Sequence, residues 1–316
     1  LKHRFPSQRH PRVRTVWHPN MDWASIVLHS LDFSGPPTLV GLYTCVFTKA
    51  CVYAVIFLVI WAVVLCMFRA AGCGATLYEQ RIGTWALKVS MLVHHIIITP
   101  LALIAMWEDE TISSMYTCFG CKRVAQFMNR NPYSPPLATR ALVPITLGYF
   151  IGDLLLLSQW NLTKGNAVET GLMIFHHVAS LVVWPASAYF DYLARYVIIM
   201  LSYEFTGIWL TALWICSSAG MKKSPVYTIV GAIFTFSFVL MRMVGAMPQL
   251  MAMWNAPPWS REAELTAQPG GIHSLCWLYA SMLVAPHLMN LFWGVKVVQG
   301  FLGVMFGKKG GKKKGA

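Results

Sequence analysis

Long apolar stretches separated by short polar connections recur along most of the chain. Each stretch has about 20 residues or more, the length of helix that crosses roughly 30 Å of hydrocarbon. The pattern predicts about seven membrane-spanning helices, at residues 38–68, 83–107, 141–160, 168–189, 192–217, 225–247 and 272–298. We therefore predict an all-α polytopic membrane protein, because a helix satisfies its own backbone polar groups in lipid.

Glycine and proline residues refine this prediction. Residues 108–140 form the longest connection, and its acidic cluster and prolines indicate an excursion onto the surface. Pro185 is expected to kink the fourth span or to end it early. Gly148 and Gly152 stand four residues apart in the third span, a spacing that allows close approach of another helix. We expect the neighbouring Asp153 to face protein rather than lipid.

Ionisable side chains stand inside several of the predicted spans. Lys, Arg and Asp cost roughly 2.5–3.5 kcal/mol each at the middle of a membrane helix, so they usually face a bundle interior, a partner or a wet cavity. The groups that need such an explanation are Lys88, His94, His95, Asp153, His176, His177, Glu204 and Arg242. Lys88, Met91 and His95 share one helix face by their spacing. His94 points about a third of a turn away from that face.

The composition excludes some classes of function. At 316 residues, with 56% hydrophobic and only 12% charged residues, the chain is too apolar for an ordinary soluble domain. Much of the net charge of +13 lies near the two ends of the chain. The sequence shows no recognition motif for nucleic acid, so we expect no nucleic-acid partner. Lysine and arginine clusters beside membrane spans are instead attracted to anionic lipid headgroups or to a protein partner.

The sequence offers little to a metal ion. Cys118 and Cys121 form a lone CxxC without the second pair that a zinc site needs, so a loop disulfide or two unreactive thiols is expected there. Adjacent histidines diverge by about 100° around a helix, which makes it difficult for one pair to chelate a single ion. We therefore expect no metal site.

Four motifs resemble, in the same order, those of the TLC-domain family: LKVSMLVHHIIITPLAL, GYFIGDLLLL, MIFHHVASLVVWP and LSYEFTGIWLTALW. This family includes the ceramide synthases, the translocating-chain-associated membrane proteins and TLC-domain proteins that affect membrane lipid composition. With this resemblance, the chain divides into a basic N-terminal arm (1–37), a first transmembrane helix with its loop (38–82), the TLC domain (83–307) and a basic C-terminal tail (308–316).

The resemblance implies a ring of about six helices around a lipid-sized cavity that opens laterally, with one further helix outside the ring. Membrane lipids are the implied ligands, and we expect a bound phospholipid or acyl lipid and no other cofactor. The side chains expected in the cavity are His95, Asp153, His176, His177, Glu204 and Arg242.

One departure from the ceramide synthases affects the expected activity. In those enzymes the His-His pair is followed by a His-Asp and a further Asp in the acyl-transfer site. The corresponding region here reads LSYEFTGI, with Glu204 and no His-Asp, and is closer to the non-synthase TLC-domain proteins. This favours a lipid-binding protein without catalytic activity, either an accessory or structural subunit of a larger membrane complex or a regulator of membrane lipid.

The alternative is a His-dependent lipid acyltransferase that resembles ceramide synthase. A neutral imidazole of the pair at residues 176–177 would act as general base or as nucleophile toward an acyl thioester, and Glu204 or Asp153 would hold its tautomer. In a purely structural hypothesis, one of these acids pairs with Arg242 or Lys88 and fixes helix packing. A metal-dependent lipid-modifying enzyme is the third hypothesis.

The two basic ends of the chain suggest different membranes. The N-terminal arm is rich in arginine and lacks acids, which is typical of the mature side of a mitochondrial presequence and equally of a basic arm on lipid headgroups. Lys313 and Lys314 resemble a dilysine signal for retrieval to the endoplasmic reticulum. We expect a multi-pass protein of the mitochondrial inner membrane or the endoplasmic reticulum. Its tail would contact lipid headgroups or partner subunits through Lys308, Lys309, Lys312, Lys313 and Lys314.

Overall fold

The computed structural model describes residues 39–71, 82–117, 137–159, 167–187, 191–255 and 273–306. Contacts divide the chain into Leu1–Asp32 and Phe33–Ala316, and all described residues belong to the second unit. The N-terminal arm, the CxxC motif and the lysine-rich tail at 308–316 lie outside the described residues. The expectations for those segments therefore stay predictions.

Every element in the described part of the chain is a helix, as the apolar pattern predicts. The main helices are α2 (Leu39–Ala70), α3 (Ile82–Glu108), α6 (Leu137–Leu155), α7 (Ala167–Ser187), α9 (Glu204–Ser218), α10 (Pro225–Phe238) and α13 (His273–Phe306). The shorter elements are α4 (Glu110–Thr117), η3 (Leu157–Gln159), α8 (Asp191–Ser202), η5 (Met221–Lys223), η6 (Val239–Val244) and α11 (Met247–Asn255).

Among the described residues, 6 helical segments are long and apolar enough to cross a membrane: Tyr43–Ala70, Ile82–Glu108, Ala167–Ser187, Ala194–Ser218, Pro225–Met251 and Val284–Phe306. The third predicted span differs, because the apolar part of α6, Ala141–Leu155, is shorter than the others. α8 and α9 together form the fifth span, with a break at Tyr203, and α10 continues through η6 into α11. The chain is thus an integral multi-pass membrane protein with one short apolar helix among its long spans.

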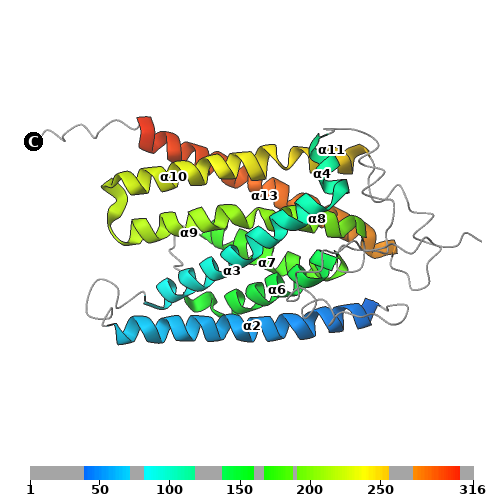
Figure 1. Ribbon diagram of the computed structural model, residues 1–316, viewed down its shortest axis with the longest axis horizontal. Coiled ribbons are helices and arrows are strands. Elements are labelled where there is room, and N and C mark those ends of the chain that lie inside the picture. The colour runs from blue at the N-terminus through cyan, green and yellow to red at the C-terminus, as the bar shows by residue number, and fades with distance from the viewer. Residues whose placement is uncertain are drawn as a thin grey trace, which may run out of the picture. The chain divides into compact units, whose positions relative to one another are not determined.

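Six helices form a closed ring of neighbours. α3 packs against α9, α9 against α10, α10 against α13, α13 against α7 and α7 against α6, and α6 returns to α3. α2 lies outside this ring and packs along α6, as the lower edge of Figure 1 shows. The described helices thus have the arrangement that the family resemblance implied, a ring of about six helices with one outer helix.

The close packing of α2 on α6 depends on two glycines. A Cβ atom added at Gly148 would lie 2.4 Å from Tyr53 Cβ, and one at Gly152 would lie 2.4 Å from Phe57 Cδ1. The missing side chains therefore let the two helices approach, as the spacing of these glycines predicted. Asp153, next to this pair, is only 2% exposed and faces protein, as expected.

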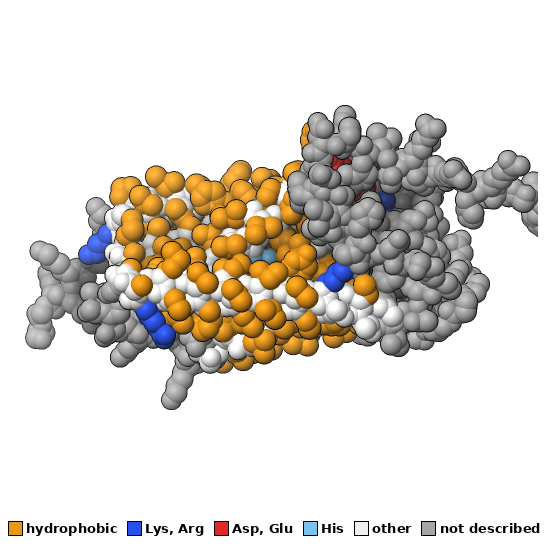
Figure 2. Space-filling view, turned by 60° about the horizontal axis from the view of Figure 1, so that its bottom comes forward, with side chains coloured by type: hydrophobic (Ala, Val, Ile, Leu, Met, Phe, Trp, Pro, Cys, Tyr) orange, Lys and Arg blue, Asp and Glu red, His pale blue; other side chains and the backbone are white. Residues whose placement is uncertain are grey.

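The outside of the bundle is apolar. Figure 2 shows hydrophobic side chains over most of the described face, with Lys and Arg side chains near both of its ends. Large exposed hydrophobic residues recur along α2: Val52, Val55, Ile56, Val59, Val63 and Met67. This surface suits the hydrocarbon chains of membrane lipids, since soluble proteins rarely expose apolar patches of this extent.

Candidate lipid cavity

A cavity of about 390 Å³ lies inside the ring, among α3, α6, α7, α9, α10, η6 and α13. Its polar lining consists of Lys88, His95, Tyr149, His176, His177, Glu204, Thr206, Thr211, Arg242 and Lys296. The rest of the lining is mainly aromatic, methionine and aliphatic side chains. A volume of this size is typical of sites that hold a small molecule among apolar side chains and orient it with a few polar groups.

Most of the residues that sequence analysis assigned to a cavity lie in this lining. They are His95, His176, His177, Glu204 and Arg242. Asp153 is not part of the lining, but it contacts His177 from the neighbouring helix.

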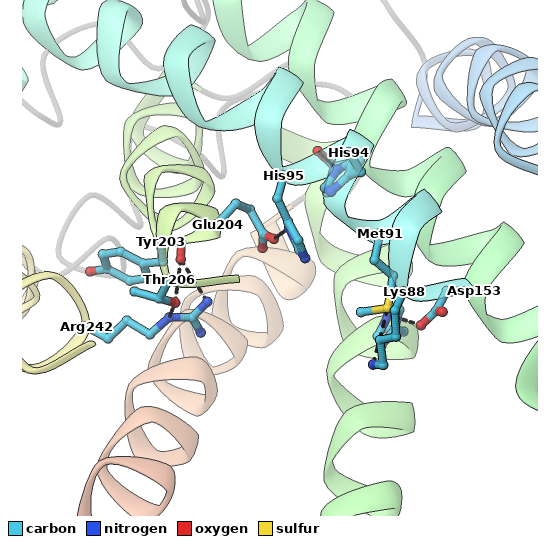
Figure 3. A network of polar contacts seen from close by, with 11 residues as sticks. Lys88, Met91, His94, His95, Asp153, Tyr203, Glu204, Thr206 and Arg242 are labelled. Carbon is cyan, nitrogen blue, oxygen red and sulfur yellow. Dashed lines mark hydrogen bonds and ion pairs between the residues drawn. The ribbon is translucent and has the colours of Figure 1, made fainter. Parts of the chain in front are cut away.

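One polar pair joins α3 to α9. His95 Nδ1 lies 2.6 Å from Glu204 Oε2, and both side chains are largely buried. Glu204 begins α9 directly after the break at Tyr203, and its carboxylate points toward the His95 ring in Figure 3. The distance suits a hydrogen bond, although the ring N–H is not aligned on the oxygen.

This contact determines the chemistry of the His95 ring. When Nδ1–H faces a carboxylate, the neutral imidazole keeps its lone pair on Nε2. Gly207 packs against the ring, since a Cβ atom there would lie 2.7 Å from His95 Cε1 and 2.8 Å from Nε2. Glu204 and Gly207 together position an imidazole with a basic nitrogen in the cavity wall.

A second pair joins α7 to α6. His177 Nε2 lies 3.1 Å from Asp153 Oδ2, and the two side chains are 1% and 2% exposed. The other ring nitrogen, Nδ1, lies 2.7 Å from the carbonyl oxygen of Met173. Both ring nitrogens therefore face protein oxygen atoms, and the ring offers no lone pair to a substrate. His177 and Asp153 connect two helices of the ring.

The adjacent His176 faces a different part of the ring. Its half-buried side chain lines the main cavity and two small hollows beside Trp184 and Pro286. In the described part of the chain it forms no ion pair with an acid. Sequence analysis assigned two carboxylates to the histidine pair, but only one of them contacts it. Asp153 contacts His177, whereas Glu204 contacts His95 on another helix.

Tyr149 of α6 is a site residue that sequence reasoning missed. Its ring stacks on His94 with centroids 4.0 Å apart and lies 6.1 Å from both His95 and His177. His94 itself turns away from the cavity and places Nε2 3.4 Å from Thr146 Oγ1. The only sequence signal was an aromatic residue beside a glycine in GYFIGD.

His94, His95 and Glu204 form the described group that could hold a metal ion, since one ligand atom from each lies within 4.8 Å of the other two. The sequence argument from diverging histidines considered one helix alone, whereas α9 brings a third ligand close to both rings. However, His95 Nδ1 is 2.6 Å from Glu204 Oε2. Two ligands about 2.0–2.1 Å from a tetrahedral ion are roughly 3.3 Å apart. The described distance is therefore that of a direct contact between the two side chains.

Arg242 lines the cavity, but its guanidinium is held by protein groups. Nε donates to Thr206 Oγ1 at 2.8 Å, Nη2 to the carbonyl oxygen of Tyr203 at 3.0 Å, and Nη1 to Asn290 Oδ1 at 3.2 Å. These bonds connect η6 to the start of α9, as Figure 3 shows, and to α13. Within the described chain Arg242 does not form the ion pair that the structural hypothesis assigned to it, because Asp153 and Glu204 each contact a histidine instead.

Two lysines also line the cavity. Lys296 of α13 forms an ion pair with Glu169 of α7. The Lys88 ammonium of α3 lies 3.4 Å from the sulfur of Met91 and 6.0 Å from the ring centroid of Trp214. Sequence reasoning placed Lys88 on the helix face of His95 but gave it only a packing role.

The fold and the cavity define a class: an integral multi-pass membrane protein whose spans enclose a polar-lined space. The TLC domain family matches residues 84–299. The chain belongs to this family, as its four motifs indicated. Membership makes it a membrane protein whose role concerns membrane lipid. No curated protein and no solved structure matches the chain.

Proposed function

We propose that the cavity inside the helical ring binds an acyl lipid. The observation that carries this proposal is a cavity of about 390 Å³ lined by membrane-spanning helices, with apolar walls and a polar cluster. Met91, Phe150 and Phe234 belong to the apolar wall and would contact an acyl chain. His95 and Glu204 would contact a carbonyl or hydroxyl group of the lipid.

In this proposal the protein is a non-catalytic member of its family, either an accessory or structural subunit of a larger membrane complex or a regulator of membrane lipid. Two observations support a binding role. His177 has both ring nitrogens directed at acceptors and is nearly inaccessible. The sequence around Glu204 lacks the His-Asp of the ceramide synthases.

Lipid binding is tested by placing the same bulk inside and outside the cavity. Met173→Trp fills the cavity, because Met173 lines it. Met67→Trp is the matched control on α2, where Met67 is 65% exposed and lies outside the cavity lining. Bound lipid per chain, measured by mass spectrometry after a mild detergent wash, should fall in the first variant and remain at the wild-type level in the second. Equal retention by all three proteins would refute the proposal.

Native electrophoresis of extracts from the native membrane tests the accessory role. We expect migration within a large complex whose other subunits purify with this chain at a fixed stoichiometry. Migration alone, or as a small homo-oligomer, would contradict that role and favour an enzyme.

The geometry of His95 and Glu204 favours a second candidate function, acyl transfer. His95 Nε2 attacks the carbonyl carbon of an acyl thioester, so that an N–C bond forms, the C–S bond breaks and the thiolate leaves. An amine or hydroxyl of a lipid acceptor then attacks the acyl-imidazole and loses its proton to the released imidazole. Glu204 orients the ring and stabilises its cationic form. The reacting histidine in this candidate is His95 rather than a member of the pair at 176–177.

Intact-protein and peptide mass spectrometry after incubation with an acyl-CoA tests this candidate. The peptide that contains His95 should gain the acyl mass, His95→Gln should abolish the adduct, and Glu204→Gln should reduce it. His287→Gln is the control, because His287 is buried but does not line the cavity. An adduct on His176 would identify His176, instead of His95, as the reacting residue. Absence of both adduct and product would reject acyl transfer.

A further inference from the structure

We propose that the cavity selects an acyl lipid with an anionic headgroup, a phosphate or a carboxylate, and that Lys88 binds the anion. This inference rests on the proposed lipid-binding function and adds the chemical class of the ligand. The surroundings of Lys88, the charge of the cavity lining and the level of Lys88 along the spans carry it.

The Lys88 ammonium meets no strong acceptor among the described residues. Its one described hydrogen bond goes to the thioether sulfur of Met91 at 3.4 Å, and sulfur is a weak acceptor for a group with three donors. The Trp214 ring, 6.0 Å away, supplies a cation–π contact. Lys88 is half-buried, and an ammonium shielded from water without an acceptor is unfavourable. A bound anion would supply the missing acceptor.

The other charged groups in the lining have protein partners. These groups are Glu204, Arg242 and Lys296. Asp153 lies near Lys88 in Figure 3, but its carboxylate contacts His177. The lining includes the cationic side chains Lys88, Arg242 and Lys296 and a single carboxylate, so its charge favours an anionic ligand. Arg242 and Lys296 already contact protein oxygens, so within the described chain Lys88 is the cationic side chain of the lining that can bind such a ligand.

The level of Lys88 suits a headgroup. Trp85, one turn earlier on α3, makes an edge contact with Trp214 near the end of α9, with ring centroids 5.1 Å apart. Tryptophan is enriched where membrane helices meet the headgroup region. His95 stands seven residues further along α3, which is about 10 Å deeper. An anion at Lys88 therefore leaves the acyl chain to extend inward past Met91 toward His95.

The test is a competition between headgroups for the full chain. The protein is reconstituted in nanodiscs with equal amounts of phosphatidylcholine and phosphatidylglycerol, re-extracted in mild detergent, and its retained lipids are counted by native mass spectrometry. The wild type should retain phosphatidylglycerol preferentially. Lys88→Gln should lower this preference roughly tenfold, as expected for loss of a hydrogen bond to a charged group, whereas Lys88→Arg should keep most of it.

Lys222→Gln is the matched control, because Lys222 is exposed in η5 and does not line the cavity. It should retain the wild-type preference, and melting curves check that each variant is folded. An equal fall in Lys88→Gln and Lys222→Gln would assign the preference to surface charge and overturn the inference. The headgroup preference of the wild type is measured without any variant, so the inference stays testable if Lys88→Gln does not fold.

Three further outcomes decide between this inference, the proposed function and a soluble ligand. Retention of lipid by the wild type without any headgroup preference would overturn the role of Lys88 and leave lipid binding in place. A wild type that retains no lipid would overturn both. Displacement of the retained lipid by free coenzyme A would show that the anion site takes the phosphates of a soluble compound, which contradicts a lipid headgroup.

Discussion

Gly207→Ala tests the packing on which the contact between His95 and Glu204 depends. The added Cβ would lie 2.7 Å from His95 Cε1, 2.8 Å from Nε2 and 2.9 Å from Nδ1. Ordinary contacts between heavy atoms lie at about 3.5–4.0 Å, so the ring has to retreat by roughly 0.7 Å or more. The His95 side chain is only 5% exposed, and its ring centroid lies 6.1 Å from that of Tyr149. Little room is therefore left for this movement.

The expected loss of stability follows from two opposing effects. One extra methyl group in a packed site costs about 1–3 kcal/mol. Replacement of glycine by alanine inside a helix returns roughly 0.5–1 kcal/mol. Gly207→Ala should therefore be destabilised by about 1–2 kcal/mol. Gly231→Ala on α10 is the control, because its Cβ would meet only Leu213 Cδ1, at 3.6 Å, and should leave stability unchanged or slightly raised.

Thermal melting followed by fluorescence-detected size exclusion, in one detergent, compares the two variants. Gly207→Ala should melt below the wild type and Gly231→Ala at or above it. If both variants melt together, the His95 ring is free to move aside and Gly207 does not position it. A fall in melting temperature that His95→Ala relieves would show that the clash is with this ring.

Other variants test the remaining contacts. Arg242→Gln should lower stability by about 2 kcal/mol, since three hydrogen bonds between membrane helices at about 0.6 kcal/mol each are lost; a thermal melt measures this. Gly148→Ala should loosen α2 from α6, because its Cβ would lie 2.4 Å from Tyr53 Cβ, whereas Gly171→Ala, with no atom within 4 Å, should melt like the wild type. Dialysis against a chelator should leave the melting temperature unchanged, because His95 and Glu204 contact one another at 2.6 Å; a drop would indicate a bound ion.

Helical periodicity was sufficient to predict which side chains share a face. Lys88, Met91 and His95 line the cavity and His94 does not, as their spacing along α3 predicted. The prediction succeeds because α3 is regular over this stretch, so that residues three, four and seven apart stay on one side. The small residues of α6 were equally informative, because only glycine permits the close approach of α2.

The sequence could not predict which polar side chains on different helices contact one another. Glu204 contacts His95 because α9 adjoins α3, and no local pattern states which helices are neighbours. The break at Tyr203 was also missed, since neither proline nor glycine stands in the stretch LSYEFT around it. There the backbone forms shorter turns, with Tyr203 N donating to Met200 O and Thr206 N to Tyr203 O. This break places Glu204 at the start of a helix instead of in the middle of a continuous span.

Each buried carboxylate described in the ring faces a histidine of a neighbouring helix. Asp153 connects α6 to α7, and Glu204 connects α9 to α3. Polar contacts between membrane helices contribute only about 0.6 kcal/mol on average, so these pairs specify which helices meet more than they hold the bundle together. The pairs differ chemically, because His177 has both ring nitrogens facing acceptors, whereas His95 keeps a lone pair on Nε2. In the acyl-transfer candidate the reacting nitrogen belongs to α3. Lys88, two turns away on the same face of α3, would hold a lipid headgroup with its acyl chain directed toward the His95 ring.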